Sequence, residues 1–85
     1  MSIREIIGAV ASIKEASNEL SVMSAAAGQA LLGCAGQISS FSQGSKSGED
    51  AVKAVNIAAA SIRDAAAQMK MLGSICDECM SSLSR

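Results

Sequence analysis

The 85-residue sequence contains no tryptophan, tyrosine, proline or histidine, and Phe41 is its only aromatic residue. Without histidine, the many serines have no obvious base to activate them as nucleophiles, and a common zinc ligand is missing. The sequence also contains no phosphate-binding loop and no cluster of carboxylates. We therefore predict a protein that is not an enzyme, with no catalytic residue, cofactor site or metal site.

The sequence also lacks a large excess of either positive or negative charge. Seven basic and eight acidic residues give a net charge of −1, and both signs are scattered along the chain. No basic patch is available to neutralise phosphates, and no aromatic side chain is placed to stack on bases. Nucleic-acid binding is therefore not expected.

The segment 20–45 carries no formal charge and is long enough to cross a bilayer. Its glutamines and serines dilute its hydropathy, so a stable membrane span is not expected. The apolar run 6–13 is closed early by Lys14 and Glu15, unlike the core of a classical signal peptide. If the protein leaves the cell, we expect it to do so without a cleaved signal.

The apolar periodicity is interrupted once, in the glycine- and serine-rich segment 41–48, which is typical of a turn. Ser47 is the predicted N-cap of the following helix, because Glu49 and Asp50 then place negative charge in its first turn. The predicted turn residues are Gly44, Ser47 and Gly48. The sequence thus predicts one all-α domain over 1–85, an antiparallel hairpin with helices over about 3–40 and 49–83.

Both predicted helices carry a three-four alternation of mostly apolar or small residues, which is typical of a helical seam. In the first helix the stripe is Ile3, Ile6, Val10, Ile13, Ser17, Leu20, Ser24, Ala27, Leu31, Cys34, Ile38 and Phe41. In the second it is Val52, Val55, Ala59, Ile62, Ala66, Met69, Gly73, Cys76, Met80 and Leu83. Flanking apolar residues make the second stripe wider than one neighbour covers. Because alanine, the commonest residue, adds little apolar area, two helices alone build a thin core. We therefore expect a partner chain to complete a four-helix bundle.

Three glycines, Gly28, Gly33 and Gly36, lie inside the first predicted helix, where each costs about 1 kcal/mol relative to alanine. Close approach of another backbone is the favoured explanation, since the stripe keeps its phase beyond them; a kink near 33–36 is the alternative. The predicted partner interface joins this small-residue strip to the second stripe. It comprises Gly28, Leu31, Gly33, Gly36, Ile38, Phe41, Val55, Ala59, Ile62, Ala66 and Met69.

Cys76 and Cys79 lie three residues apart on one helix face and could reach a common metal ion. Zinc would require two more ligands, and Cys34 lies roughly 30 Å away in the predicted hairpin. The three cysteines are therefore interpreted as small residues in or near the core. A metal site shared between two chains is the alternative.

The short chain, its near-equal helices, the absence of a signal peptide and an aromatic near a glycine at the turn resemble the WXG family of type VII secretion substrates. The most similar members are the small companions of LXG toxins. The resemblance implies that such hairpins pair into four-helix assemblies. Phe41-Ser42-Gln43-Gly44 departs from the family's Trp-x-Gly by one extra residue, and the Tyr-x-x-x-acid export signal has no counterpart.

This resemblance implies a targeting or chaperone companion of an LXG-type toxin, located in the cytoplasm before export. Its expected partner is the helical N-terminal domain of the toxin or a second small hairpin protein. The missing signal leaves open whether this chain is itself exported. The alternative is a self-assembling homodimeric four-helix bundle that serves as a scaffold or regulatory module. A chemoreceptor-like signalling hairpin and a membrane-inserting helical peptide rank below both.

Overall fold

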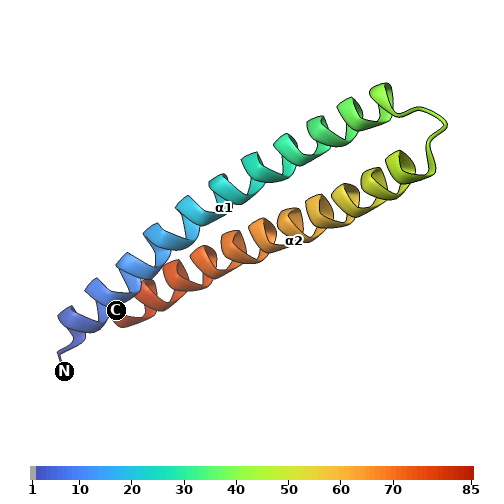
Figure 1. Ribbon diagram of the computed structural model, residues 1–85. Helices are drawn as coiled ribbons and strands as arrows, with labels where there is room; N and C mark the ends of the chain where they lie inside the picture. The colour runs from blue at the N-terminus through green and yellow to red at the C-terminus, as the bar shows by residue number, and fades with distance from the viewer. Residues whose placement is uncertain (1) are drawn as a thin grey trace.

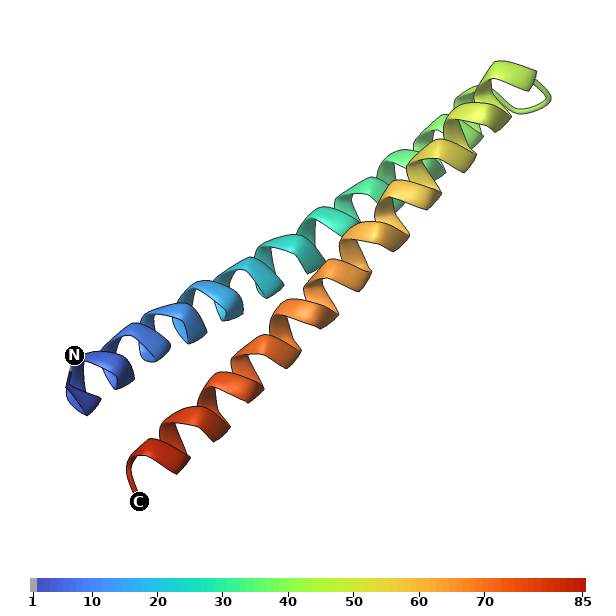
Figure 2. The same cartoon turned by 90° about the horizontal axis from the view of Figure 1, so that it is seen from below.

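The computed structural model describes residues 2–85, which form two long helices joined by a short connection. Helix α1 spans Ile3–Phe41 and helix α2 spans Lys46–Leu83. The helices run antiparallel and lie side by side, with both chain termini at one end of the molecule (Figure 1). The hairpin is 62 Å long and 17 × 13 Å across, and in Figure 2 the two helices overlap near the turn and separate toward the termini. The predicted all-α hairpin is confirmed.

The N-terminus of α1 is capped by the side chain of Ser2. Ser2 has an extended backbone, and its hydroxyl accepts a hydrogen bond from the Glu5 amide at 3.2 Å. This bond satisfies one of the amide groups that have no partner within the first turn. From there α1 continues without interruption through Gly28, Gly33 and Gly36. The helix is therefore not broken at its glycines.

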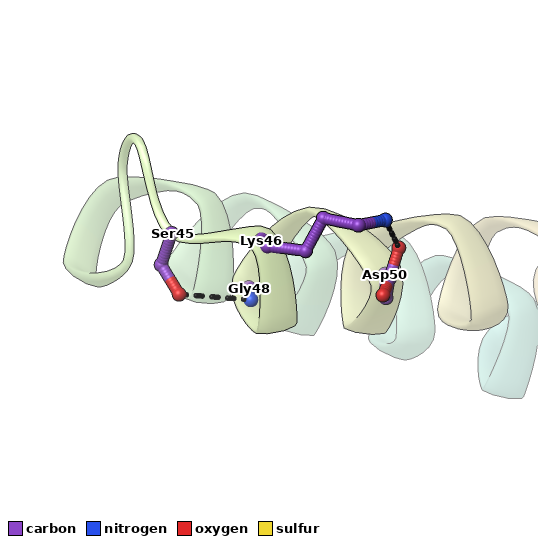
Figure 3. A network of polar contacts seen from close by, with 4 residues as sticks. All are labelled: Ser45, Lys46, Gly48 and Asp50. Carbon is purple, nitrogen blue, oxygen red and sulfur yellow. Dashed lines mark hydrogen bonds and ion pairs between the residues drawn. The ribbon is translucent and has the colours of Figure 1, made fainter.

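The connection between the helices is shorter than predicted. Gly44 adopts the left-handed region at φ +83°, which glycine reaches without steric cost. Ser45 then caps α2: its hydroxyl accepts a hydrogen bond from the Gly48 amide at 3.3 Å, while Lys46 pairs with Asp50 (Figure 3). The prediction of Ser47 as the cap was wrong, because Ser45 offers the same hydroxyl as soon as the chain has reversed. Ser47 and Gly48 therefore belong to the first turn of α2.

The two helices meet along a seam of small residues. The buried residues are Ser17, Gly28 and Ala35 in α1 and Gly48, Ala59, Ala66, Gly73 and Cys76 in α2. Ala59 has no exposed surface, and no large side chain among residues 2–85 is fully buried. A Cβ atom added at Gly28 would lie 3.7 Å from the Ala59 carbonyl oxygen, so the two backbones approach closely there. The core is thin because its side chains are short.

Two glycine substitutions distinguish the effect of close packing on stability from the effect of helix propensity. At Gly48, a new Cβ would lie 2.9 Å from the backbone oxygen of Ser42, which cannot move freely. We expect Gly48→Ala to lower the free energy of unfolding by about 1–3 kcal/mol. At Gly36, which has open space around it, alanine should raise that free energy by about 1 kcal/mol.

Urea unfolding followed by circular dichroism measures both changes under the same conditions. Equal effects of the two substitutions on the transition midpoint would contradict the described approach of the turn to α2.

Candidate partner-binding face

The seam of α1 is rotated from the predicted stripe. Val10, Ser17, Ser24, Leu31 and Ile38 are buried or half-buried as predicted. The residues that alternate with them are not the predicted Ile13, Leu20, Ala27, Cys34 and Phe41, all of which are exposed. They are the next residues along the chain: Lys14, Ser21, Gly28, Ala35 and Ser42. A serine, a glycine and an alanine in this row let α2 approach more closely than bulky side chains would, so close packing decides the phase.

The stripe of α2 agrees with the structure at every position, since all ten residues are buried or half-buried. Its bulky members, such as Val55, Ile62 and Met69, alternate with Ala59, Ala66 and Gly73. Bulky and small positions therefore both border the seam in α2, whereas the α1 seam has small residues at most positions, with Val10, Leu31 and Ile38 as its bulky members.

Most of the predicted partner interface lies within the hairpin. Buried or half-buried members are Gly28, Leu31, Ile38, Val55, Ala59, Ile62, Ala66 and Met69. The exposed members are Gly33, Gly36 and Phe41, and no atom lies within 4 Å of a Cβ added at either glycine. The close approach expected at three glycines therefore occurs within the hairpin only at Gly28. A surface for a partner has to be sought beside the seam.

One side of the seam is polar. Lys14 forms an ion pair with Asp77 at 2.5 Å, and the hydroxyl of Ser21 donates a hydrogen bond to the Ala66 carbonyl oxygen at 2.9 Å. The amide oxygen of Asn18 lies over Gly73, and the side chain of Arg63 lies over Gly28. These contacts fix the relative height of the two helices. This side of the seam therefore carries charged side chains.

The opposite side carries an apolar surface, the uncharged face. It consists of two rows with a seven-residue repeat, which keeps each row on nearly one side of its helix. The rows are Ile6, Ile13, Leu20, Ala27, Cys34 and Phe41 in α1 and Ala51, Ala58, Ala65, Leu72 and Cys79 in α2. In α1 this row lies along one edge of the seam, and Asn18 lies on the other edge. In α2 the row again lies along one edge, and Lys70 and Asp77 lie on the other.

The uncharged face is apolar and largely exposed. Leu20 is 46% exposed, Leu72 is 39% exposed and Phe41 is 90% exposed. None of the seven basic and eight acidic residues lies in either row, or in the adjoining outer rows that contain Met23 and Ile75. Val22, Ile57 and Met71 are exposed outside these rows, but only on this face are bulky apolar side chains grouped without any charge among them, and such patches are typical of interaction sites.

The cysteines do not form a metal centre in this arrangement. Cys76 is buried, whereas Cys34 and Cys79 are exposed. Residues 2–85 contain no group of three or more cysteine or acidic side chains placed to hold one ion. The interpretation of all three cysteines as core or near-core residues was wrong for Cys34 and Cys79, because both lie on the uncharged face.

Thiol labelling tests this assignment of faces. In dilute solution we expect Cys34 and Cys79 to react readily with a maleimide. Cys76 should react at least about tenfold more slowly, because a buried thiol is modified mainly when the structure opens. Mass spectrometry of peptides over time measures each rate. A slow reaction at Cys34 together with a fast reaction at Cys76 would contradict the assignment of the seam.

No known family model, no curated protein sequence and no solved structure matches this chain. Inference about its function therefore starts from the hairpin and its two faces.

Proposed function

We propose that the protein is a non-enzymatic helical hairpin that docks through its uncharged face against a helical partner and so completes a four-helix bundle. The observation that carries this proposal is an exposed apolar face that contains no charged residue. Ile13 and Leu20 in α1 and Leu72 in α2 lie on one side, while Lys14 and Asp77 mark the other. A second pair of helices would bury these apolar side chains without burying a charge.

The more specific proposal is a targeting or chaperone companion for an LXG-type toxin of type VII secretion, with the helical N-terminal domain of that toxin as its partner. Its support is the near-equal length of the two helices, 39 and 38 residues, and the exposed aromatic residue beside the turn. Under this proposal the chain acts in the cytoplasm before export. A homodimeric scaffold or regulatory module would use the same face.

The membrane-inserting alternative finds no support in the helices themselves. Neither α1 nor α2, which account for nearly all of the described residues 2–85, has the length of apolar sequence that a bilayer crossing requires. This agrees with the expectation of no stable membrane span.

The companion role is tested with the neighbouring reading frames. The gene should lie beside one that encodes a long chain with an N-terminal helical domain. When both proteins are co-expressed, they should purify together at a fixed stoichiometry. A neighbourhood without such a gene, or a helical domain that does not bind the hairpin, would rule out this role.

Charge placed on the uncharged face should separate binding from folding. We expect Leu20→Glu combined with Leu72→Glu to weaken the complex with the helical domain at least about 100-fold, because two carboxylates would be buried without partners. Isothermal titration calorimetry measures the affinity, and circular dichroism checks that the helices remain.

The matched control is Val22→Glu combined with Met71→Glu. Val22 and Met71 are 71% and 63% exposed and lie outside both rows of the uncharged face. This variant should bind like the original protein. Equal losses in the two variants would show that the face is wrongly assigned.

A further inference from the structure

Three exposed cations of α2 lie along the polar side of the seam. The side chain of Arg63 lies over Gly28, and Lys53 and Lys70 border hollows of about 300 and 480 Å³ between the two helices. Lys53 and Lys70 are roughly 25 Å apart along the helix axis, with Arg63 between them. Although the basic residues are scattered along the sequence, the fold therefore gathers these three on one side of the hairpin.

The three cations have no anionic partner within the hairpin. The two ion pairs among residues 2–85 involve other lysines. The cause lies in α1, because its segment 20–41 carries no formal charge and runs beside the first half of α2, as the hydrogen bond from Ser21 to Ala66 shows. Glu49 borders the hollow at the turn but takes part in neither ion pair. Positive charge on this side is thus left without compensation.

The hollow beside Lys70 is largely apolar. Val22 and Ala25 of α1 and Ala67 of α2 border it, and all three are exposed. No charge of α1 enters this lining, although Asn18 and Ser21 contribute polar groups to it. A ligand that covers this side must therefore combine negative charge with apolar groups at the same level.

We propose that the polar side of the seam binds an acidic helical segment of a partner protein. Its carboxylates face the three cations, and its apolar side chains cover the hollow beside Val22. Arg63 and Lys70 are seven residues apart, about 10 Å along the axis, and a helix with acidic residues at every seventh position has the same spacing. The planar guanidinium of Arg63 is suited to hold a carboxylate through two parallel hydrogen bonds.

Phosphate-bearing ligands fit this side less well. Strong nucleic-acid binding relies on many phosphate contacts, whereas the three cations are spread over roughly 25 Å of helix, with Glu49 beside the turn. Neither a phosphate backbone nor a layer of lipid headgroups has apolar groups at the level of its charges to fill the hollow beside Val22. An amphipathic helix presents both kinds of group on one face.

This site is separate from the uncharged face, because the two lie on opposite sides of the seam. Binding on the polar side is therefore independent of the proposed four-helix bundle. The hairpin can hold a helical pair on one side and an acidic helix on the other at the same time, and so connect two partners.

Fluorescence anisotropy with labelled synthetic peptides tests the polar side directly. The probe is a helical peptide with leucines and glutamates on one face. The control peptide has the same composition in an order that distributes the glutamates around the helix. We expect the full chain to bind the probe at least about tenfold more tightly than the control peptide, because only the probe places its carboxylates against the three cations together.

Lys53→Gln combined with Lys70→Gln should weaken probe binding at least about tenfold, because two charge-assisted contacts are lost while the packing of Arg63 is left intact. The matched control is Arg4→Gln combined with Arg85→Gln, which removes the same charge at the end with the termini. It should bind the probe like the original protein. Circular dichroism checks that both variants remain helical.

A preference for the probe together with a loss confined to the lysine variant supports the proposal. Equal binding of the two peptides, or equal losses in the two variants, would show a general attraction between charges and overturn it. A probe that does not bind at high micromolar concentration also overturns it, whether or not a duplex oligonucleotide or a phosphatidylserine vesicle binds instead.

The variant with glutamates at positions 20 and 72 separates this site from the proposed function. Because those substitutions lie on the uncharged face, they should leave probe binding unchanged while they weaken the complex with the helical domain. Loss of probe binding in that variant would show that the two sides are not independent, which contradicts the assignment of the acidic helix to the polar side.

Discussion

The close approach of two helical backbones is the constraint on which the rest of this hairpin depends. Gly28 and Ala59 bring the helices together near mid-length, and Ala66 and Gly73 continue the contact toward the termini. Small side chains permit this approach, but they bury little apolar area. Much of the bulky apolar surface of α1 therefore lies outside the seam, where it is available for association.

The polar side of the seam contributes orientation more than stability. The ion pair between Lys14 and Asp77 is partly exposed, and such pairs contribute about 0–1 kcal/mol. Together with the hydrogen bond from Ser21 to Ala66, however, it sets the height of one helix against the other. That alignment brings the two apolar rows into a common face. Folding and association are thereby coupled, because any molecule that binds this face also stabilises the hairpin.

Much of the fold follows from sequence patterns, and the differences have a common cause. The two helices and the stripe of α2 could be predicted because apolar and buried positions coincide there. In α1 they do not coincide: the pattern selects Leu20 and Cys34, whereas the seam selects the small residues that follow each bulky one. Apolar periodicity identifies bulky rows but does not show whether a row faces the neighbouring helix or a further partner.

The uncharged face carries bulkier side chains toward the termini than in the half nearer the turn, where Phe41 is the exception, and this taper limits which partners can cover it well. Bulky side chains such as Leu20 and Leu72 require a partner that is small at the end of the hairpin with the termini, and the alanines near the turn require one that is bulky there. A heterologous helical pair must acquire the inverse taper in its own sequence. Discrimination among partners can therefore arise from the shape of the rows, without any charge on the face.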